Sequence, residues 1–525
     1  MHFLITIILI VFGCLAAQGQ PSGYNRTYKA GTYGCSFPAA EPFGNDGMMV
    51  AAFSLDSQAV TTGIKFIRVD KYGDIRALNY LTLNDTFFVW HAYRSFTRIN
   101  DNQYVAVCNV ETTNGIRSWL IATVDSNAQV TNYKHLPAPV CQGNSFITIR
   151  DIKYASAGNS LLVLGHIECG LNDEYQMLLM KLDTSLNIGW TKTYGVANRM
   201  NLAVGILIED DGYIMFGQRD NGNLVAPYKE NYFSSAQMIK VDTAGTAQWT
   251  YLSEQSSLYS EMRDLARTPD NGYLYICSGN TITTTPPGFN PDRYCKGLVI
   301  KLDSARNELW RKECEEHYTH FPGVWPYEIM TEPGGNFLIT GNYDDSVGLH
   351  LYEPYGGLMK FAPDGQLKWT RRYKATDTLA WNLESYKFED GFVMNDRILL
   401  AGTFYNATNG WSADEAVYGW IVNLDSNGCV DPLNGNCGTT TVPQVAKKTD
   451  LILYPNPTAG ELFIGNPTRG FLDISVTDIA GHLLIKRTGA DERVRLDVRA
   501  LIPGTYLCTV TSKGQILLQD KFIRE

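Results

Sequence analysis

A repeat of about 60 residues is the feature that most limits how this chain can fold. An apolar, strand-like segment that mostly ends in Leu-Asp or Val-Asp recurs seven times, at intervals of 55 to 63 residues. The final residues of the seven copies are Asp70, Asp125, Asp183, Asp242, Asp303, Ala362 and Asp425. Such a period is typical of architectures in which each unit covers the apolar face of its neighbour.

Each repeat contains signals for four strands in two hairpins. In four copies a tryptophan follows seven residues after the end of the segment, and turn-forming residues lie between, as in DTAGTAQW. These tryptophans are Trp190, Trp249, Trp310 and Trp369. An earlier hairpin surrounds an acidic or glycine turn, as in LARTPDNGYLYICSG. Four short antiparallel strands cannot bury both of their faces alone, so the pattern predicts an all-β, seven-bladed β-propeller over residues 20–437.

The repeated Asp and Trp residues have a structural interpretation. An Asp side chain at this place can cap the turn that follows, and a Trp ring can pack between blades. The last copy lacks a clear fourth strand, whereas YNRTYK at residues 24–29 resembles WTKTYG at residues 190–195. We therefore expect the N-terminal segment to supply the outer strand of the last blade, which would close the ring and leave no unpaired edge.

The N-terminus has the pattern of a secretory signal peptide. An apolar run from Phe3 to Ala17 is followed by small and polar residues, which predicts a signal peptide over residues 1–19. Cys14 leaves a lipoprotein as an alternative, although the bulky Phe12 two positions earlier suits a lipid-modifying peptidase poorly. No later uncharged segment has membrane-spanning length, so we expect a mature chain that is soluble or attached to a surface, without a transmembrane segment.

Charge and cysteine content narrow the class of protein further. The net charge of -10 provides no basic surface for phosphate contacts, so nucleic acid is not an expected partner. Ten of the 11 cysteines remain after Cys14 is removed, which permits disulfides in an exported protein. Cys429 and Cys437 flank DPLNGN and form a candidate disulfide. Others, such as Cys108, Cys277 and Cys508, lie in strand-like runs and are interpreted as buried apolar side chains.

A polar, proline-containing linker at residues 438–449 precedes a second domain at residues 450–525. Six expected strands in this domain predict a small β-sandwich. They cover approximately residues 462–464, 472–477, 482–487, 493–497, 505–511 and 516–523.

The residues of this domain resemble a known family. LILYPNPTAGELFI at residues 451–464, VTDIAGHLL, LIPGTYLCTV and KFI resemble the ordered motifs of the type A sorting domain of the type IX secretion system. The positions that carry the resemblance are Tyr454, Pro455, Asn456, Pro457, Gly460, Asp478, Gly481, Gly504, Tyr506 and Lys521. The resemblance implies a source in the Bacteroidetes, passage through the periplasm, recognition by the type IX translocon, and delivery outside the cell or to its surface. An adhesive immunoglobulin-like domain is the alternative for a terminal β-domain.

The sequence assigns no catalytic residue, cofactor or metal. His317 and His320 in ECEEHYTH have helical spacing, but this stretch is expected to be a strand end or a loop. The acidic runs at residues 209–211 and 344–345 lack the alternating spacing of a calcium loop and are interpreted as turns. No sequence signature of an NTPase, a dehydrogenase or an α/β-hydrolase occurs between an expected strand and an expected helix, where such a motif would be functional.

Two function classes remain open. Long insertions rich in Tyr, Trp, Asn and Asp occur near Tyr228, Pro287, Tyr352 and Trp411, and loops of this composition could stack on sugar rings or hold a peptide. The first hypothesis is therefore a non-catalytic module that binds a glycan or a protein. The second is a hydrolase or lyase acting on polysaccharide, with carboxylates from different blades meeting at the mouth of the channel.

Overall fold

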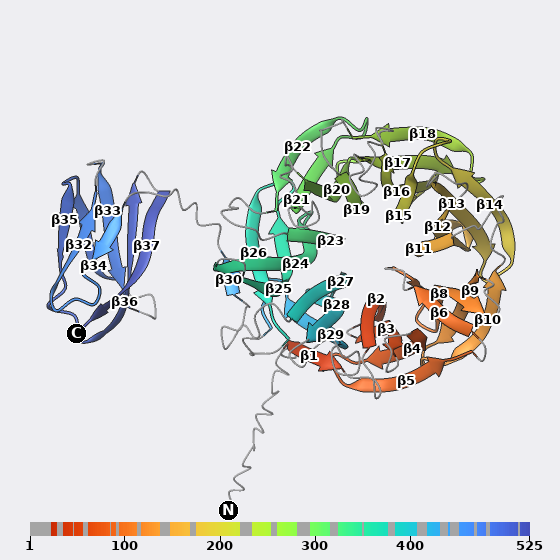
Figure 1. The fold of residues 1–525 in the computed structure, drawn as a ribbon, viewed down its shortest axis with the longest axis horizontal. Coiled ribbons are helices and arrows are strands. Elements are labelled where there is room, and N and C mark those ends of the chain that lie inside the picture. Colours follow the sequence, from red (N-terminus) through yellow and green to blue (C-terminus); the bar gives the residue numbers. More distant parts are fainter. Residues whose placement is uncertain are drawn as a thin grey trace, which may run out of the picture. The chain divides into compact units, whose positions relative to one another are not determined.

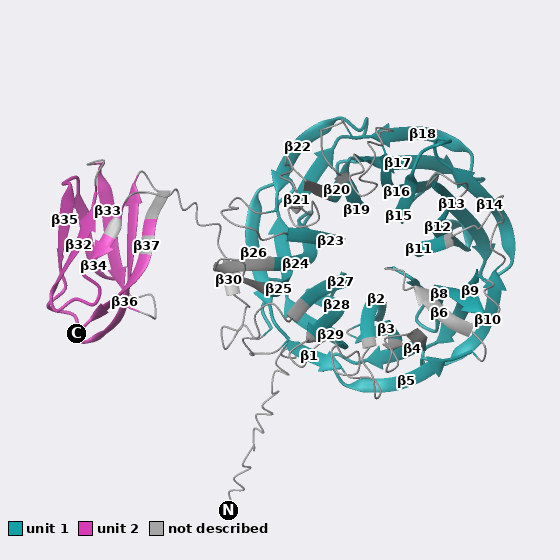
Figure 2. Cartoon of the chain, viewed as in Figure 1, with its two compact units in different colours: residues 1–440 teal, residues 441–525 magenta. Residues whose placement is uncertain are grey.

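The computed structural model divides the chain into two compact units, residues 1–440 and 441–525, which we call unit 1 and unit 2 (Figure 2). The structure describes residues 23–28, 35–45, 47–55, 61–83, 86–90, 94–112, 117–136, 147–168, 175–220, 234–253, 260–280, 295–314, 324–348, 351–375, 384–406, 417–430, 439–441, 451–466, 470–478, 483–512 and 515–525. The expected signal peptide lies outside these residues, as does the expected linker except for residues 439–441. In the described part, no helix is long and apolar enough to cross a membrane.

Unit 1 is a ring of antiparallel sheets around a central axis, the arrangement of a β-propeller (Figure 1). Three sheets follow the chain in order, strand by strand. They comprise β11 Ile147–Ala155, β12 Ser160–Glu168, β13 Tyr175–Asp183 and β14 Ile188–Tyr194; β15 Asn201–Glu209, β16 Gly212–Asp220, β17 Ser234–Asp242 and β18 Ala247–Leu252; and β19 Ser260–Arg267, β20 Tyr273–Asn280, β21 Cys295–Leu302 and β22 Glu308–Glu313. A fourth comprises β23 Val324–Thr331, β24 Phe337–Gly348, β25 Leu351–Phe361 and β26 Leu367–Tyr373, with β30 Thr439–Thr441 beside β26. The first strand of each of these sheets lies nearest the axis and the fourth lies on the outside of the ring (Figure 1).

The first two repeats merge into one nine-stranded sheet, which the sequence pattern did not predict. Their strands are β2 Cys35–Phe43, β3 Gly47–Leu55, β4 Thr61–Val69 and β5 Ile75–Leu81, and β7 Phe96–Asn100, β8 Gln103–Thr112, β9 Arg117–Asp125 and β10 Val130–Leu136. An extra strand, β6 Thr86–Trp90, pairs with β8 along its length and with β4 at one position. Its sequence TFFVW has high β-propensity, so it pairs in the connection between two repeats.

The predicted closure of the ring is confirmed. The last sheet contains β27 Glu384–Met394, β28 Arg397–Asn406 and β29 Val417–Asp425, and its fourth strand is the N-terminal β1 Tyr24–Tyr28. The pairing is antiparallel, with Tyr24 opposite Asn423 and Tyr28 opposite Gly419. The ring is therefore joined by the two ends of unit 1, which removes two unpaired edges.

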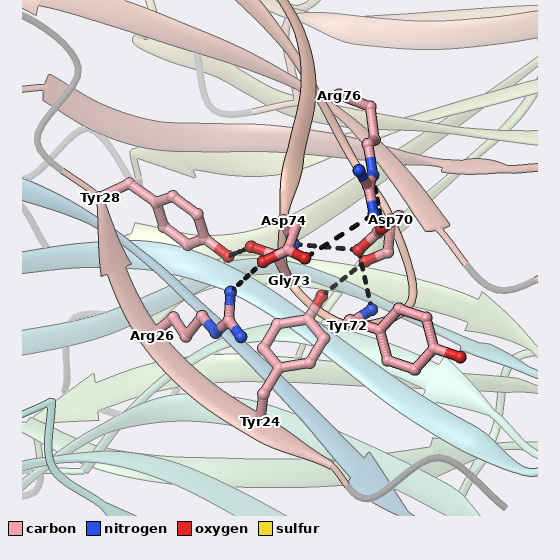
Figure 3. A network of polar contacts seen from close by, with 8 residues as sticks. All are labelled: Tyr24, Arg26, Tyr28, Asp70, Tyr72, Gly73, Asp74 and Arg76. Carbon is pink, nitrogen blue, oxygen red and sulfur yellow. Dashed lines mark hydrogen bonds and ion pairs between the residues drawn. The ribbon is translucent and has the colours of Figure 1, made fainter.

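Side chains of β1 also hold the first sheet, through the turn between β4 and β5 (Figure 3). The Tyr28 hydroxyl donates to the Gly73 carbonyl at 2.8 Å, and Arg26 forms an ion pair with Asp74 at 2.7 Å. Gly73 has a φ of 82°, and a Cβ there would lie 2.9 Å from the Tyr24 ring. Glycine at this turn thus allows both the left-handed backbone and the close approach of the ring.

The same contact recurs between other sheets, which explains the repeated sequence motif. Tyr194 and Tyr373 each donate a hydroxyl hydrogen bond at 2.7 Å to the carbonyl of the corresponding turn glycine, Gly245 and Gly428. Trp190 packs over Gly245, where an added Cβ would lie 2.9 Å from the ring. The repeated aromatic residues therefore connect neighbouring sheets, as predicted.

The repeated Asp residues cap turns, also as predicted. In six copies one carboxylate oxygen accepts at least one backbone N–H from the following turn, at 2.7 to 2.9 Å. These residues are Asp70, Asp125, Asp183, Asp242, Asp303 and Asp425. The copy that ends in Ala362 keeps the backbone turn bond from Gly365 to Ala362 without a side-chain cap.

Replacement of Tyr28 by Phe is expected to lower the free energy of unfolding of unit 1 by about 1 kcal/mol, because the ring stays and only the hydrogen bond to Gly73 is lost. Tryptophan fluorescence during denaturant unfolding reports this unit alone, since all 10 tryptophans precede residue 441. Tyr72→Phe is the control, because the Tyr72 side chain is half exposed. Equal destabilisation by both changes would contradict a specific role for the Tyr28 bond.

Unit 2 consists of two sheets that share one apolar core. One contains β31 Ile452–Tyr454, β32 Glu461–Gly465 and β35 Arg493–Asp497. The other contains, in spatial order, β34 Leu483–Gly489, β33 Leu472–Thr477, β36 Gly504–Ser512 and β37 Gln515–Arg524. Inward residues of both sheets, such as Leu462, Leu496, Val476 and Phe522, form a single cluster. The six expected strands are confirmed to within two residues at each end, and β31 is an additional strand.

Candidate functional site

Three carboxylates on the innermost strands each hold the backbone of the next sheet. They follow a register shift in β11, β19 and β27, where the irregular backbone redirects one side chain. Each accepts a backbone N–H from the inner strand of the neighbouring sheet. The pairs are Asp151 with Ile206 at 2.8 Å, Asp264 with Ile329 at 2.7 Å, and Asp390 with Ala40 at 2.7 Å.

Arg94 connects several sheets from the short segment between β6 and β7. One guanidinium nitrogen binds the Asp264 carboxylate at 2.7 Å, and the other donates to the Tyr327 carbonyl at 3.2 Å. The same guanidinium lies 5.8 Å from the centre of the Phe216 ring, and the Arg94 carbonyl accepts the N–H of Ile152. Arg94 and Asp264 are both more than nine-tenths buried, so each charge depends on the other.

Two carboxyl groups interact with each other and with the charges of this ion pair. Glu328 of β23 and Asp390 of β27 interact electrostatically. Burial raises the pKa of both groups, and the negative charge of Asp390 raises the pKa of Glu328 further. Each group therefore opposes ionisation of the other, because two like charges close together in a poorly solvated site do not both form easily.

Glu41 of β2 has its pKa raised from 4.5 to about 7, chiefly by burial, with Lys153 opposing the shift and Asp390 adding to it. Because the folded-state pKa lies above the unfolded value, this carboxyl contributes stability below pH 4.5 that is lost as pH rises through 7. The free energy of unfolding relative to Glu41→Gln is therefore expected to fall by up to about 3 kcal/mol between pH 4.5 and 7.5.

Denaturant titrations of both proteins, followed by tryptophan fluorescence, measure this difference. Comparison with the variant is needed because the buried His166 acts in the opposite direction. Its pKa is lowered to about 3 by burial, so it costs stability as pH falls below 6.5. Parallel pH curves for the wild type and Glu41→Gln would contradict the assignment.

The acidic runs at residues 209–211 and 344–345, which the sequence interprets as turns rather than calcium loops, differ from each other in the structure. Lys240 is buried and forms ion pairs with Glu209 and Asp211 at the turn after β15. Corresponding lysines in the next two sheets bind Asp270 and Glu332. The interpretation of residues 209–211 as a turn is confirmed, but residues 344–345 lie within β24, so their interpretation as a turn was wrong. Strand pairing continues through them to Gly348 because β25 extends along the whole of β24.

The YPNP segment of unit 2 holds the end of the chain. The Asn456 side-chain amide donates to the Lys521 carbonyl at 2.7 Å, and its oxygen accepts the Ile523 N–H at 2.9 Å. Thr458 continues this contact, since its N–H donates to Ile523 and its carbonyl accepts from Glu525. The peptide bonds before Pro455 and Pro457 are cis. Residues more than 60 positions apart are thus joined by backbone and side chain.

Other predicted motif residues lie near the same end of unit 2. Tyr506 donates its hydroxyl to the Ile502 carbonyl at 2.7 Å and stacks on Phe522 with ring centres 5.6 Å apart. Gly504 pairs with Arg524, and Leu507 with Lys521. Asp478 directly follows β33, which pairs with β36 at Thr477 and Leu507.

Two further motif residues have separate positions. The Gly460 carbonyl accepts the Val498 N–H, and an added Cβ would lie 2.6 Å from the Arg499 side chain. Tyr454 ends β31, with the Arg493 guanidinium 5.4 Å from its ring centre. Gly481 lies outside the described residues.

Residues 452–525 match the family model for the secretion system C-terminal sorting domain. Unit 2 contains a sorting domain. A sorting domain of this kind directs its protein to the type IX secretion machinery, so the chain is exported to the cell surface or beyond it. The match begins at β31 and includes Asn456, Thr458 and all of β37, so the contact between the YPNP segment and the chain end lies within the sorting domain.

The comparisons with whole proteins are less specific than the sorting-domain match. No curated protein matches the chain. Among solved structures, it is similar to the β-propeller domain of the Trilobed protease from Pyrococcus furiosus, at 8% identity over 74% of this chain and 94% of that one, with a TM-score of 0.39. It is also similar to polysaccharide lyase Uly1, at 10% identity over 78% and 93%, with a TM-score of 0.40. These likenesses are too distant to inform function.

Several expectations lie outside the described part of the chain. Cys437, His317 and His320 are among those residues, as are Tyr228, Pro287 and Trp411 of the long insertions. Cys429 is buried and its N–H donates to Asp425, while its predicted disulfide with Cys437 stays a prediction. Cys108, Cys277 and Cys508 lie buried in β8, β20 and β36, as expected.

The axial residues Arg94, Asp264 and Asp390 were missed by sequence reasoning. A signal was present, because IRDIKY, MRDLAR and FEDGFV each place an Asp as the third residue of a similar segment in the inner strand. Arg94 gave no comparable signal, since it precedes β7 in a segment with no counterpart in other repeats.

Proposed function

We propose that this chain is an exported binding protein, in which the sorting domain engages the type IX translocon and the propeller binds a glycan or protein partner without catalysis. The observation that carries the non-catalytic assignment is the use of the axial carboxylates. Asp151, Asp264 and Asp390 each accept a backbone N–H from the next sheet, so they serve the closure of the ring. Binding then falls to the aromatic insertions between strands, as is usual for loops on a rigid scaffold.

The finer organisation follows the same proposal. We infer seven blades over residues 20–437, because the two halves of the nine-stranded sheet repeat the four-strand pattern of the other sheets. A signal peptide at residues 1–19 and a linker at residues 438–449 complete this organisation, with residues 450–525 forming a β-sandwich. A disulfide between Cys429 and Cys437 and a source in the Bacteroidetes agree with an exported protein of this kind.

The alternative is a polysaccharide hydrolase or lyase, and one observation favours it. Glu328 and Asp390 have raised pKa values, and a carboxyl group kept protonated near neutral pH can serve as a general acid. However, Asp390 accepts the backbone N–H of Ala40 at 2.7 Å, so one carboxyl of this pair already holds the neighbouring sheet. Binding is therefore the better supported function.

A glycan and protein array with the full exported chain tests this choice, followed by incubation with each bound polysaccharide. The wild type and Glu328→Gln are expected to bind the same ligand and to release no product from it. The two proteins should bind alike because Glu328 lies among inner-strand residues rather than in an insertion. Product release by the wild type that is lost in Glu328→Gln would replace binding by catalysis as the function.

A further inference from the structure

The larger sheet of unit 2 has two different edges. At the β37 edge, Thr458 forms a parallel bridge with Arg524, and the Asn456 side chain holds the neighbouring backbone. At the other edge, β34 pairs only with β33 among the described residues. An open edge of this kind presents unpaired backbone groups that can accept another strand.

The side chains of β34 combine apolar and basic character. Leu483 and Leu484 are 57% and 44% exposed, and Lys486 and Arg487 are also exposed. Ile485 packs on the shared core, which fixes the strand to its own sheet. The sequence LLIKRTG of this strand contains no carboxylate, so its edge carries only positive charge.

The charge distribution decides what can pair with this edge. Lys486 is the middle residue of β34, so twofold antiparallel pairing of the whole strand with that of a second copy would place Lys486 opposite Lys486. Like charges directly opposite each other destabilise a pair of strands. A strand with acidic side chains avoids this repulsion and forms favourable cross-strand pairs with Lys486 and Arg487.

We propose that β34 is the strand through which the sorting domain docks, by adding to the edge of an acidic β-strand in the secretion machinery. Backbone hydrogen bonds supply the pairing, Leu483 and Leu484 supply apolar contact, and the two basic residues select the partner and its register. This inference rests on the export role of unit 2, and it adds the surface and the chemistry of the partner.

Export of full-length variants from a host with a type IX system tests the proposal. Lys486→Glu with Arg487→Glu reverses the charge of the edge, and Leu484→Asn removes apolar contact. Each is expected to lower the fraction of protein outside the cell by about tenfold or more, because like charges across an interface cost several kcal/mol and lost apolar contact weakens docking. Lys486→Arg keeps the positive charge, and this variant is expected to be exported as efficiently as the wild type.

The outer strand β22 of unit 1 supplies matched controls. Leu309→Asn and Lys312→Glu change the same residue types at exposed positions and are expected to leave export unchanged. Melting temperatures of the purified proteins should agree within a few degrees, since all the changed side chains are exposed.

The remaining outcomes distinguish docking through β34 from the export role of the sorting domain. Normal export of both β34 variants, with export abolished by removal of residues 451–525, would overturn docking through β34 and leave the role of the sorting domain intact. Normal export after that removal would overturn the export role itself. A dimer of the wild type in sedimentation that the Lys486→Glu and Arg487→Glu variant loses would assign β34 to self-association and overturn the proposal.

Discussion

Removal of residues 451–525 is expected to leave the protein in the periplasm, with essentially none in the medium or on the cell surface. The deleted residues include the whole match to the sorting-domain family, and they contain both the YPNP segment and the chain end that it binds. Unit 1 should still fold, because its ring is closed by β1 and β29 and all of its sheets precede residue 442. Cell fractionation followed by immunoblotting measures the distribution.

A milder change provides the control for this deletion. Asn456→Ala keeps the chain length and removes only the side-chain bonds to Lys521 and Ile523, so it should reduce export less than the deletion. Tryptophan fluorescence should give the same unfolding midpoint for unit 1 in the full chain and in the truncated one. Unchanged amounts of truncated protein outside the cell would contradict the sorting role.

Replacement of Asp264 by Ala is expected to destabilise unit 1 by roughly 3 to 5 kcal/mol, a much larger loss than that from breaking an exposed ion pair. The substitution leaves the Arg94 guanidinium buried without its carboxylate and removes the acceptor of the Ile329 N–H. The Arg94 pKa reflects this dependence: burial by itself lowers it, but the charges of Asp264 and Glu328 raise it above the ordinary value. Denaturant unfolding followed by tryptophan fluorescence measures the loss.

An exposed ion pair and a double variant complete the experiment. Glu308→Ala breaks the surface pair with Arg311 and should cost no more than about 1 kcal/mol. Arg94→Leu combined with Asp264→Ala removes both charges and should cost less than the sum of Arg94→Leu and Asp264→Ala measured singly, because neither charge is then left buried alone. Additive losses would contradict a direct coupling between Arg94 and Asp264.

Closure of the ring could be read from the sequence because it depends on a repeated local pattern. YNRTYK matches WTKTYG in the order of its aromatic and basic residues, and both segments contact the turn of the next sheet through a tyrosine hydroxyl. The caps formed by Asp183 and Asp242 could be predicted for the same reason, because their hydrogen bonds reach only a few residues along the chain. Motifs that act locally and repeat with a fixed period are visible without a structure.

The sequence by itself determined the repeat of strands, the pairing of the N-terminal segment with the last sheet, and the sorting domain at the end of the chain. Only the tertiary structure decided that Arg94 meets Asp264, 170 residues away, and that Asp390 holds Ala40, 350 residues away. It also decided that β6 joins the first two repeats and that β34 is the open edge of its sheet. Such contacts depend on how whole sheets are placed around an axis, and the burial that makes a charge or an edge important arises only once those sheets have packed.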